Sequence, residues 1–179
     1  MIYIVVALKP EAQAFVDYFR LKKSKLSNST LFTNEKIRLI ISHIGVESAR
    51  IATQTLINNY DITDEDSFYN IGICGASNEF EIGDLLDIGT VNYQEQSYTF
   101  NEDKATIHCV DEEITQEGKA LVDMESFGFY DAVIHNPAIK KFHIYKVVSD
   151  HFEPHLVTKE KTKSLLFAKM EQFKKMMHL

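Results

Sequence analysis

The segment Met1–Phe19 reads MIYIVVALKPEAQAFVDYF and sets the pattern on which the fold prediction rests. Residues 2–7 form a continuous apolar run rich in β-branched side chains, which predicts a buried strand. Pro10 follows at a position where the first turn of a helix tolerates proline. Apolar residues then recur at helical spacing, namely Ala12, Phe15, Val16 and Phe19. A strand that leads directly into a helix is therefore expected at the start of the chain.

The alternation of strands and helices continues along the rest of the sequence. Segments with strand-like patterns are 30–33 and 37–42, which are expected to form a hairpin, and 68–73, 85–91, 105–110 and 142–149. Segments with helical spacing of apolar residues are 46–57, 125–135 and a closing helix whose apolar face is Leu166, Met170, Phe173 and Met177. The polar stretch 92–104 is expected to be a loop.

This alternation favours an α/β fold, because strands that alternate with helices build a mostly parallel sheet with helices on both faces. The chain has 179 residues, which suits one domain with its own hydrophobic core. We therefore expect a single three-layer domain over 1–179, with a central mixed, mostly parallel sheet flanked by helices.

Composition argues against several classes of partner. The net charge is -7, and the sequence shows no basic stripe with interleaved aromatic residues, so a nucleic acid is not expected to bind. No apolar run approaches the roughly 20 residues that cross a bilayer, and no basic leader precedes the first strand. A cytoplasmic protein with a small-molecule ligand and no membrane contact is expected. The two cysteines, Cys74 and Cys109, suggest buried thiols rather than a disulfide or zinc site, with Cys74 as a nucleophile the alternative.

Active-site residues of such sheets gather where strands end and loops begin. Four places in this sequence fit that rule: Lys9–Glu11, Gly72–Ala76, Asp123–Ser126 and Ser149–Asp150. Taken alone, each carboxylate also has a structural explanation. A Glu in the first turn of a helix is favoured by the helix dipole, an Asp before a helix caps it, and an Asp after a strand often forms a turn.

Taken together, the motifs resemble the purine nucleoside phosphorylase family, and most closely its methylthioadenosine/S-adenosylhomocysteine nucleosidase branch. Met1–Glu11 is similar to the first strand of that branch and its acidic tip. The other motifs follow in the family's order. Ser42-His43-Ile44-Gly45 is similar to SGIG, and Asn70–Ala76 with Ile82-Gly83-Asp84 is similar to NTGSAGG and VGD. Asp123-Met124-Glu125-Ser126 is similar to EMES or EMEA, and Val147–Asp150 is similar to the segment that ends in SD.

The resemblance implies roles for particular residues in cleaving the bond between a ribose and a purine. Asp150 would donate a proton to purine N7, with Ser149 orienting it, and Glu11 would activate the attacking water. Glu125 would hold the ribose hydroxyls, with Met124 behind the sugar. The implied substrate-binding set is completed by Gly75, Ala76 and Lys146, which stands where the branch has Arg. No metal or cofactor is implied, and Pro154 disturbs the zinc-like spacing of His151 and His155.

The same comparison bears on whether water or phosphate attacks the sugar. Phosphorylases of the family carry an Arg and a Ser or Thr around a glycine, where this chain has Asn70 and Ile73. Their phosphate-binding N-terminal loop is also replaced, by Lys9-Pro10-Glu11. Since phosphate sites need forked Arg or N–H donors, hydrolysis of a purine nucleoside is the favoured activity.

Two alternatives stay open on the sequence. A phosphorylase could recruit its phosphate donors from a neighbouring subunit. A non-catalytic protein could keep the fold and bind a nucleoside, since Ile73 stands where the nucleosidase branch has Ser and the segment 91–123 is shorter than its counterpart. Tyr98 and Phe152 are candidates for stacking on a purine, although packing is the commoner role of such aromatic residues. The family assembles as dimers or larger oligomers, so a homodimer or higher homo-oligomer is expected.

Overall fold

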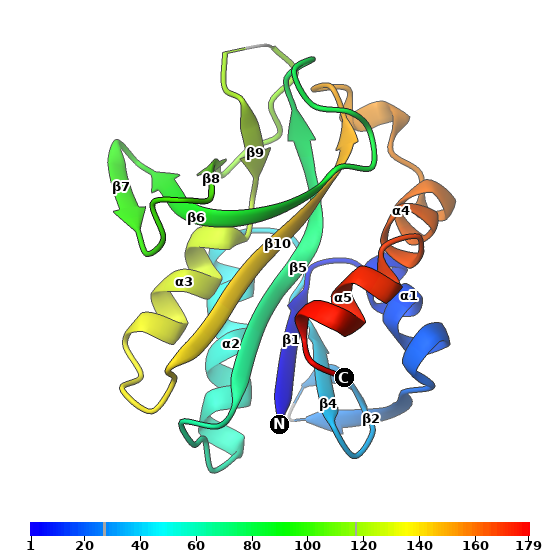
Figure 1. Ribbon diagram of the computed structural model, residues 1–179, viewed down its shortest axis with the longest axis vertical. Coiled ribbons are helices and arrows are strands. Elements are labelled where there is room, and N and C mark those ends of the chain that lie inside the picture. The colour runs from blue at the N-terminus through cyan, green and yellow to red at the C-terminus, as the bar shows by residue number, and fades with distance from the viewer. Residues whose placement is uncertain (27, 117) are drawn as a thin grey trace.

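A mixed β-sheet runs through the centre of the molecule, and α-helices lie on its two sides (Figure 1). The computed structural model describes residues 1–26, 28–116 and 118–179. In this part of the chain the strand order is β10-β6-β8-β9-β5-β1-β4-β3-β2, with β7 paired to β6.

The first half of the chain contains β1 (Ile2–Val6), α1 (Lys9–Phe19), β2 (Lys22–Leu26), β3 (Ser29–Thr33), β4 (Ile37–Ile41), α2 (Val46–Asn59) and β5 (Ser67–Ala76). The second half contains β6 (Leu85–Tyr93), β7 (Gln96–Thr99), β8 (Ala105–Cys109), β9 (Leu121–Asp123), α3 (Ser126–Ile134), β10 (Lys141–Asp150), a 3₁₀ turn (Pro154–Leu156), α4 (Lys159–Phe167) and α5 (Met170–Met176).

The centre of the sheet is parallel. Strand β1 lies between β4 and β5, with Ile4 opposite both Leu39 and Tyr69, and β5 also pairs in parallel with β10. The apolar run of β1 is buried on both faces, as a central parallel strand requires. Because these strands run in one direction, their carboxyl ends meet at the same edge of the sheet. That edge is where the sequence places its candidate residues.

Strand β5 has further partners that bend the sheet. It pairs with β10 and, antiparallel, with β9, and the pairings continue through β6 and β8 until they return to β5. The strands β5, β10, β6, β8 and β9 therefore form a closed ring of pairings. This closure brings the segment after β8 and the start of α3 close to the ends of β5 and β10.

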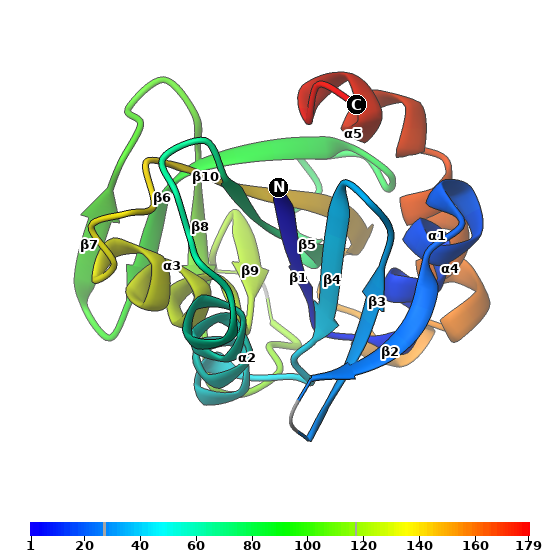
Figure 2. The same ribbon diagram turned by 90° about the horizontal axis from the view of Figure 1, so that it is seen from below.

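The helices divide between the two faces of the sheet (Figures 1 and 2). Helices α2 and α3 pack together on one face, and α1, α4 and α5 cover the other. The three-layer α/β architecture expected from the sequence is confirmed. None of the helices in the described ranges is long and apolar enough to cross a membrane.

Most of the predicted helices and strands are present, and the strands that the sequence did not predict are polar or short. The predicted loop 92–104 is wrong in part, because Gln96–Thr99 forms β7 after a two-residue turn in which Gln94 and Glu95 have positive φ. Strands β2 and β9 were not expected. The closing helix is two helices, since the backbone leaves helical geometry at Lys169 (φ -100°, ψ 1°). Its four apolar residues are nevertheless all buried, as predicted.

Candidate active site

A cavity of about 270 Å³ opens at the carboxyl ends of β1, β5 and β10. Its wall includes residues from all four places marked in the sequence, among them Glu11, Gly75, Glu125 and Asp150. Segments far apart in the chain are thus joined at one edge of the sheet. Three of its carboxylates, those of Glu11, Glu125 and Asp150, are each held in place by hydrogen bonds.

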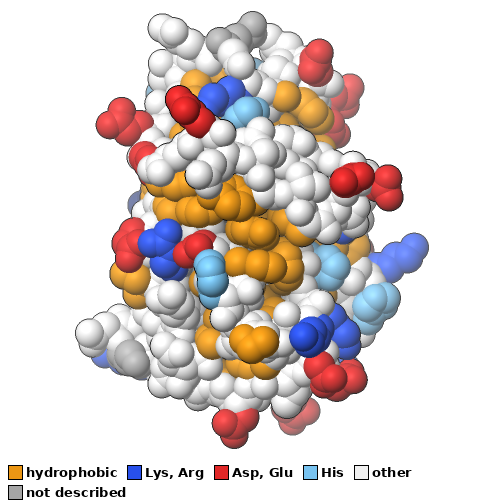
Figure 3. All heavy atoms as spheres, turned by 90° about the vertical axis from the view of Figure 1, so that its left-hand side faces the viewer, with side chains coloured by type: hydrophobic (Ala, Val, Ile, Leu, Met, Phe, Trp, Pro, Cys, Tyr) orange, Lys and Arg blue, Asp and Glu red, His pale blue; other side chains and the backbone are white. Residues whose placement is uncertain are grey.

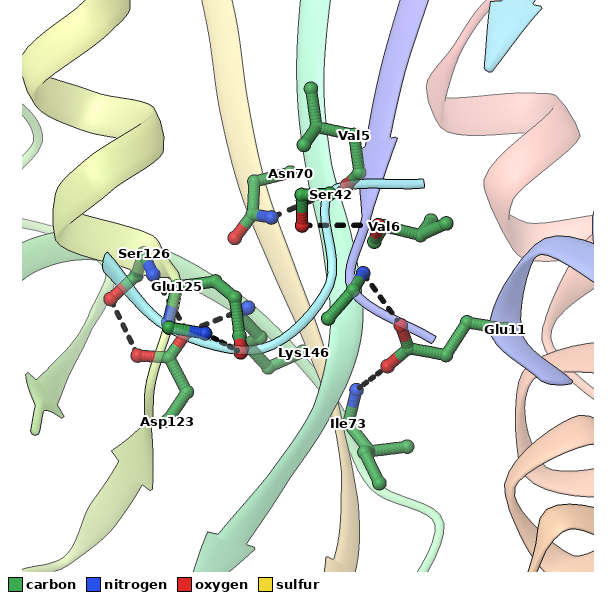
Figure 4. A network of polar contacts seen from close by, with 12 residues as sticks. Val5, Val6, Glu11, Ser42, Asn70, Ile73, Asp123, Glu125, Ser126 and Lys146 are labelled. Atoms are coloured by element: carbon green, nitrogen blue, oxygen red, sulfur yellow. Dashed lines mark hydrogen bonds and ion pairs between the residues drawn. The ribbon is translucent and has the colours of Figure 1, made fainter. Parts of the chain in front are cut away.

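Glu11 is held by backbone N–H groups near the carboxyl end of β1 (Figure 4). Its Oε2 accepts hydrogen bonds from Ala7 N (2.9 Å) and Leu8 N (2.8 Å), and its Oε1 accepts one from Ile73 N (2.9 Å). The bonds to Ala7 and Leu8 also cap the start of α1, so one side chain has a structural role and still faces the cavity. A Cβ at Gly72 would lie 2.8 Å from Oε1, and this glycine therefore makes room for the carboxylate.

Burial and the neighbouring donors shift the pKa of Glu11 in opposite directions. Burial raises the pKa of its carboxyl group, and this effect exceeds the lowering by the three N–H donors and by the Lys146 ammonium. Glu11 is only 1% exposed. A carboxylate that is buried in this way accepts a proton more readily than one in water.

Glu125 lies at the start of α3, where helix packing brings a donor to it. Its Oε1 accepts a hydrogen bond from Gly45 N (3.1 Å), at the start of α2. The two helices approach closely at Gly128, where a Cβ would lie 1.9 Å from the Val46 carbonyl oxygen. Gly128 therefore permits the contact that positions Glu125 against the start of α2.

Lys146 and Asp123 form a buried ion pair beneath Glu125. The distance from Lys146 Nζ to Asp123 Oδ2 is 2.7 Å, and both side chains are at most 1% exposed. Asp123 also accepts hydrogen bonds from Ser126 N (2.9 Å) and Ser126 Oγ (2.6 Å), which fixes the start of α3. Burial lowers the pKa of Lys146, but the carboxylates of Asp123, Glu125 and Glu11 outweigh it and raise the pKa, so the side chain stays charged.

Asp150 ends β10 and is bound through both carboxyl oxygens. Oδ1 accepts a hydrogen bond from Glu153 N (2.9 Å), and Oδ2 lies 2.6 Å from Ser149 Oγ. Ser149 Oγ also lies 3.1 Å from the Cys74 carbonyl oxygen. The Ser149 hydroxyl group donates to Asp150 Oδ2 at the shorter of its two distances. A side-chain donor and a backbone donor thus fix the Asp150 carboxyl group at the end of β10.

The structure places the other predicted residues as follows. Met124, Gly75 and Ser149 line the cavity together with the three carboxylates, whereas Ala76 and Lys146 lie outside its wall. Ala76 is fully buried and its carbonyl oxygen contacts His151 Nδ1 (3.2 Å). Phe152 lines the cavity, while Tyr98 packs against Phe127 and Tyr130 instead.

The cysteines are buried and free, as predicted. Cys74 borders the cavity, but burial strongly raises the pKa of its thiol, which disfavours the nucleophilic thiolate. Within the described ranges, no group of three or more His, Cys, Asp or Glu side chains is arranged to hold a metal ion.

Several contributors to the site were given no role on the basis of the sequence. The Gly45 and Ile73 N–H groups act through the backbone, and Gly72 and Gly128 act by having no side chain, so residue chemistry gives no direct signal for them. Other wall residues follow β8, namely Val110, Glu113 and Ile114. They come from a stretch whose position against the cavity depends on the closed ring of strands.

The surroundings of Glu125 predict a pH-dependent stability. Burial is the main cause that raises its pKa to about 7, opposed by Lys146 and reinforced by Asp123 and Glu11. The folded protein therefore holds this proton more tightly than the unfolded chain, and stability falls as pH rises from about 4.5 to about 7. In Glu125→Gln this fall is removed, so the variant gains about 3 kcal/mol relative to wild type across that window, measured by urea unfolding.

The matched control is Glu35→Gln, which makes the same change at an exposed position outside the cavity wall and is expected to leave the pH dependence of stability as in wild type. Parallel stability curves for wild type and Glu125→Gln would show that Glu125 does not hold its proton in the folded state.

Comparison with known proteins gives matches in structure alone, since the sequence matches no protein-family model and no curated protein. Futalosine hydrolase of Helicobacter pylori strain 26695 superposes with a TM-score of 0.82 at 13% identity, over 99% of this chain and 97% of that one. The 5′-methylthioadenosine/S-adenosylhomocysteine nucleosidase from Helicobacter pylori, solved with butyl-thio-DADMe-Immucillin-A, gives 0.80 at 13% identity, with the same coverage.

The corresponding nucleosidase from Colwellia psychrerythraea 34H, in complex with adenine, gives a TM-score of 0.72 at 18% identity, over 96% of this chain and 94% of that one. At such identities, similarity over nearly whole chains shows a shared fold. The chain therefore has the nucleoside phosphorylase-like fold of these nucleosidases, as its sequence motifs indicate.

Proposed function

We propose that this protein hydrolyses the N-glycosidic bond of a purine nucleoside, such as methylthioadenosine, S-adenosylhomocysteine or a related compound, and releases the free base. The observation that carries the proposal is the convergence of Glu11, Glu125 and Asp150, from three separate elements, around one cavity. The shared fold supports it, because the similar structures include nucleosidases with adenine or an immucillin bound.

The chemistry needs three groups. Cleavage of the bond builds an oxocarbenium-like sugar, so the departing base must be neutralised, the ribose held and a nucleophile presented on the opposite face. In our proposal Asp150 protonates purine N7. Its hydrogen bonds from Ser149 Oγ and Glu153 N support this role, because they fix the orientation of the carboxyl group at the cavity wall.

Glu11 serves as the base that takes a proton from the attacking water. Its burial raises its proton affinity, and its three backbone hydrogen bonds fix its position. Ile73 has no side-chain donor, but its N–H group is one of those three.

Glu125 holds the ribose hydroxyls, with Met124 beside the sugar. Both residues line the cavity, and Gly45 N–H keeps the Glu125 carboxylate in place. Lys146 acts from behind the wall, where its charge offsets those of Asp123 and Glu125. We therefore assign Lys146 an electrostatic role instead of direct contact with the substrate.

Water is favoured over phosphate by the charges of the cavity wall. Among the residues that the structure describes, the wall contains no Lys, Arg or His side chain, whereas a phosphate dianion needs such donors. By the resemblance to the family, Lys9-Pro10-Glu11 also replaces the phosphate-binding loop, and the Glu11 carboxylate would repel phosphate. This arrangement supports hydrolysis over phosphorolysis.

Base release tests the proposal. Incubation with methylthioadenosine, S-adenosylhomocysteine, adenosine and inosine, followed by chromatography, is expected to yield free base at the same rate with and without added phosphate. Release that depends on phosphate would make the protein a phosphorylase. Nucleoside binding without any release would make it a non-catalytic member of the fold.

Variants separate the three roles. Asp150→Asn and Glu11→Gln are each expected to lower kcat by at least about 100-fold, the usual contribution of a general acid or base, while Glu11→Gln retains ligand binding. Glu81→Gln, which changes an exposed carboxylate outside the cavity wall, is the control and keeps wild-type activity. Full activity in either cavity variant would remove that residue from the mechanism.

We also propose that the protein acts in the cytoplasm as a homodimer. Figure 3 shows hydrophobic side chains gathered on the side of the molecule where β7 and α3 lie. Nearby helices carry exposed apolar residues, Ile51 on α2 (54% exposed) and Ile134 on α3 (50%). Sedimentation at micromolar concentration is expected to give twice the chain mass of 20.6 kDa. A single species at the chain mass would contradict the dimer.

A further inference from the structure

Among the residues that the structure describes, Phe152 is the only aromatic residue in the cavity wall. Its side chain is 4% exposed, yet it belongs to neither of the two clusters of buried apolar residues that form the core of the described chain. Packing in the core therefore does not by itself explain a phenylalanine at this position.

The backbone at Phe152 lies in the left-handed region (φ 58°), which a bulky side chain rarely adopts. Two contacts hold the turn that contains it. Asp150 Oδ1 accepts a hydrogen bond from Glu153 N (2.9 Å), and His151 Nδ1 lies 3.2 Å from the Ala76 carbonyl oxygen. A bulky residue kept in this conformation indicates a requirement for its side chain.

The turn places the Phe152 ring beside the proposed acid. Both border the open face of Gly75, where an added Cβ would lie 3.5 Å from Phe152 Cδ1 and 3.6 Å from Asp150 Oδ1. In the proposed reaction Asp150 protonates purine N7, so the base lies against this carboxyl group. A planar base in that place comes within reach of the ring, and bases stack favourably on aromatic side chains.

We propose that Phe152 recognises the base, with its ring stacked on the purine that Asp150 protonates. Asp150 then has a second role, because its Oδ1 closes the turn that positions the ring. The inference rests on the proposed nucleosidase function and adds to it a residue that contacts the base. It concerns the base alone and leaves the 5′-substituent of the nucleoside free to vary.

Binding of free adenine, measured by calorimetry at pH 7, tests the stacking. Phe152→Leu keeps an apolar side chain but removes the ring, and it is expected to raise the Kd for adenine at least about fivefold. Phe152→Tyr keeps the ring and is expected to stay within about twofold of wild type. Phe167→Leu is the matched control, because it makes the same change at an exposed position (45%) outside the cavity wall and should leave the Kd unchanged.

Unchanged adenine binding by Phe152→Leu would overturn the stacking, and so would an equal effect of the two Leu variants. Urea unfolding of the same variants separates loss of the ring from loss of the fold. If Phe152→Leu does not fold, Phe152→Asn supplies the test, because Asn tolerates the left-handed backbone. This variant also removes the ring and is expected to weaken adenine binding.

A double-mutant cycle tests the second role of Asp150. Asp150→Asn keeps an oxygen that can accept a hydrogen bond from Glu153 N, whereas Asp150→Ala removes it. Phe152→Leu is therefore expected to weaken adenine binding fully in the Asn background but less than about twofold in the Ala background, where the turn is already lost. Equal effects in both backgrounds would show that the ring does not depend on Asp150 for its position and would overturn this role.

Base release from methylthioadenosine separates the inference from the proposed function. If adenine binding follows the expected order of variants but wild type releases no base, the hydrolytic function fails and the base contact stands. If wild type releases base and Phe152→Leu changes neither the KM for methylthioadenosine nor the Kd for adenine, the function stands and the base contact fails. Absence of adenine binding by wild type would also overturn the base contact.

Discussion

The buried ion pair between Lys146 and Asp123 is the interaction on which the rest of the site depends. Two charged side chains that are at most 1% exposed can stay charged only if each compensates the other. The pair joins β10 to the end of β9, and through Ser126 it fixes the start of α3. Loss of either partner would leave an unpaired charge inside the protein, at a typical cost of about 3–5 kcal/mol.

The same ion pair lowers the energetic cost of burying several carboxylates close together. Glu11 and Glu125 both lie within the field of the Lys146 ammonium group, which lowers their pKa values against the opposite effect of burial. Both carboxyl groups line the cavity, and their ionised forms make its field negative. A site with this field suits chemistry that builds a positive sugar, and it disfavours an anionic nucleophile such as phosphate. The same residues therefore stabilise the fold and take part in the proposed chemistry.

The sequence predicted those features that depend on local pattern. The strand-to-helix start, the hairpin and the buried face of the closing segment follow from hydrophobic spacing, and the candidate carboxylates follow from strand ends. Features that depend on tertiary contact could not be predicted in this way. The exposed strand β2 is rich in Lys and has no apolar period, and the contribution of Gly128 depends on how closely α2 approaches α3. Likewise, Glu113 reaches the cavity only because the ring of strands closes.

A crystal structure with butyl-thio-DADMe-Immucillin-A, the ligand bound to a structurally similar nucleosidase, tests the central claim most directly. The account predicts that the inhibitor occupies the cavity between Glu11 and Asp150. Asp150 should lie within hydrogen-bond distance of its base, Glu125 should contact the group that replaces the ribose, and Glu11 should face that group from the side opposite the base. An inhibitor bound elsewhere, or bound without contact to these three carboxylates, would contradict it.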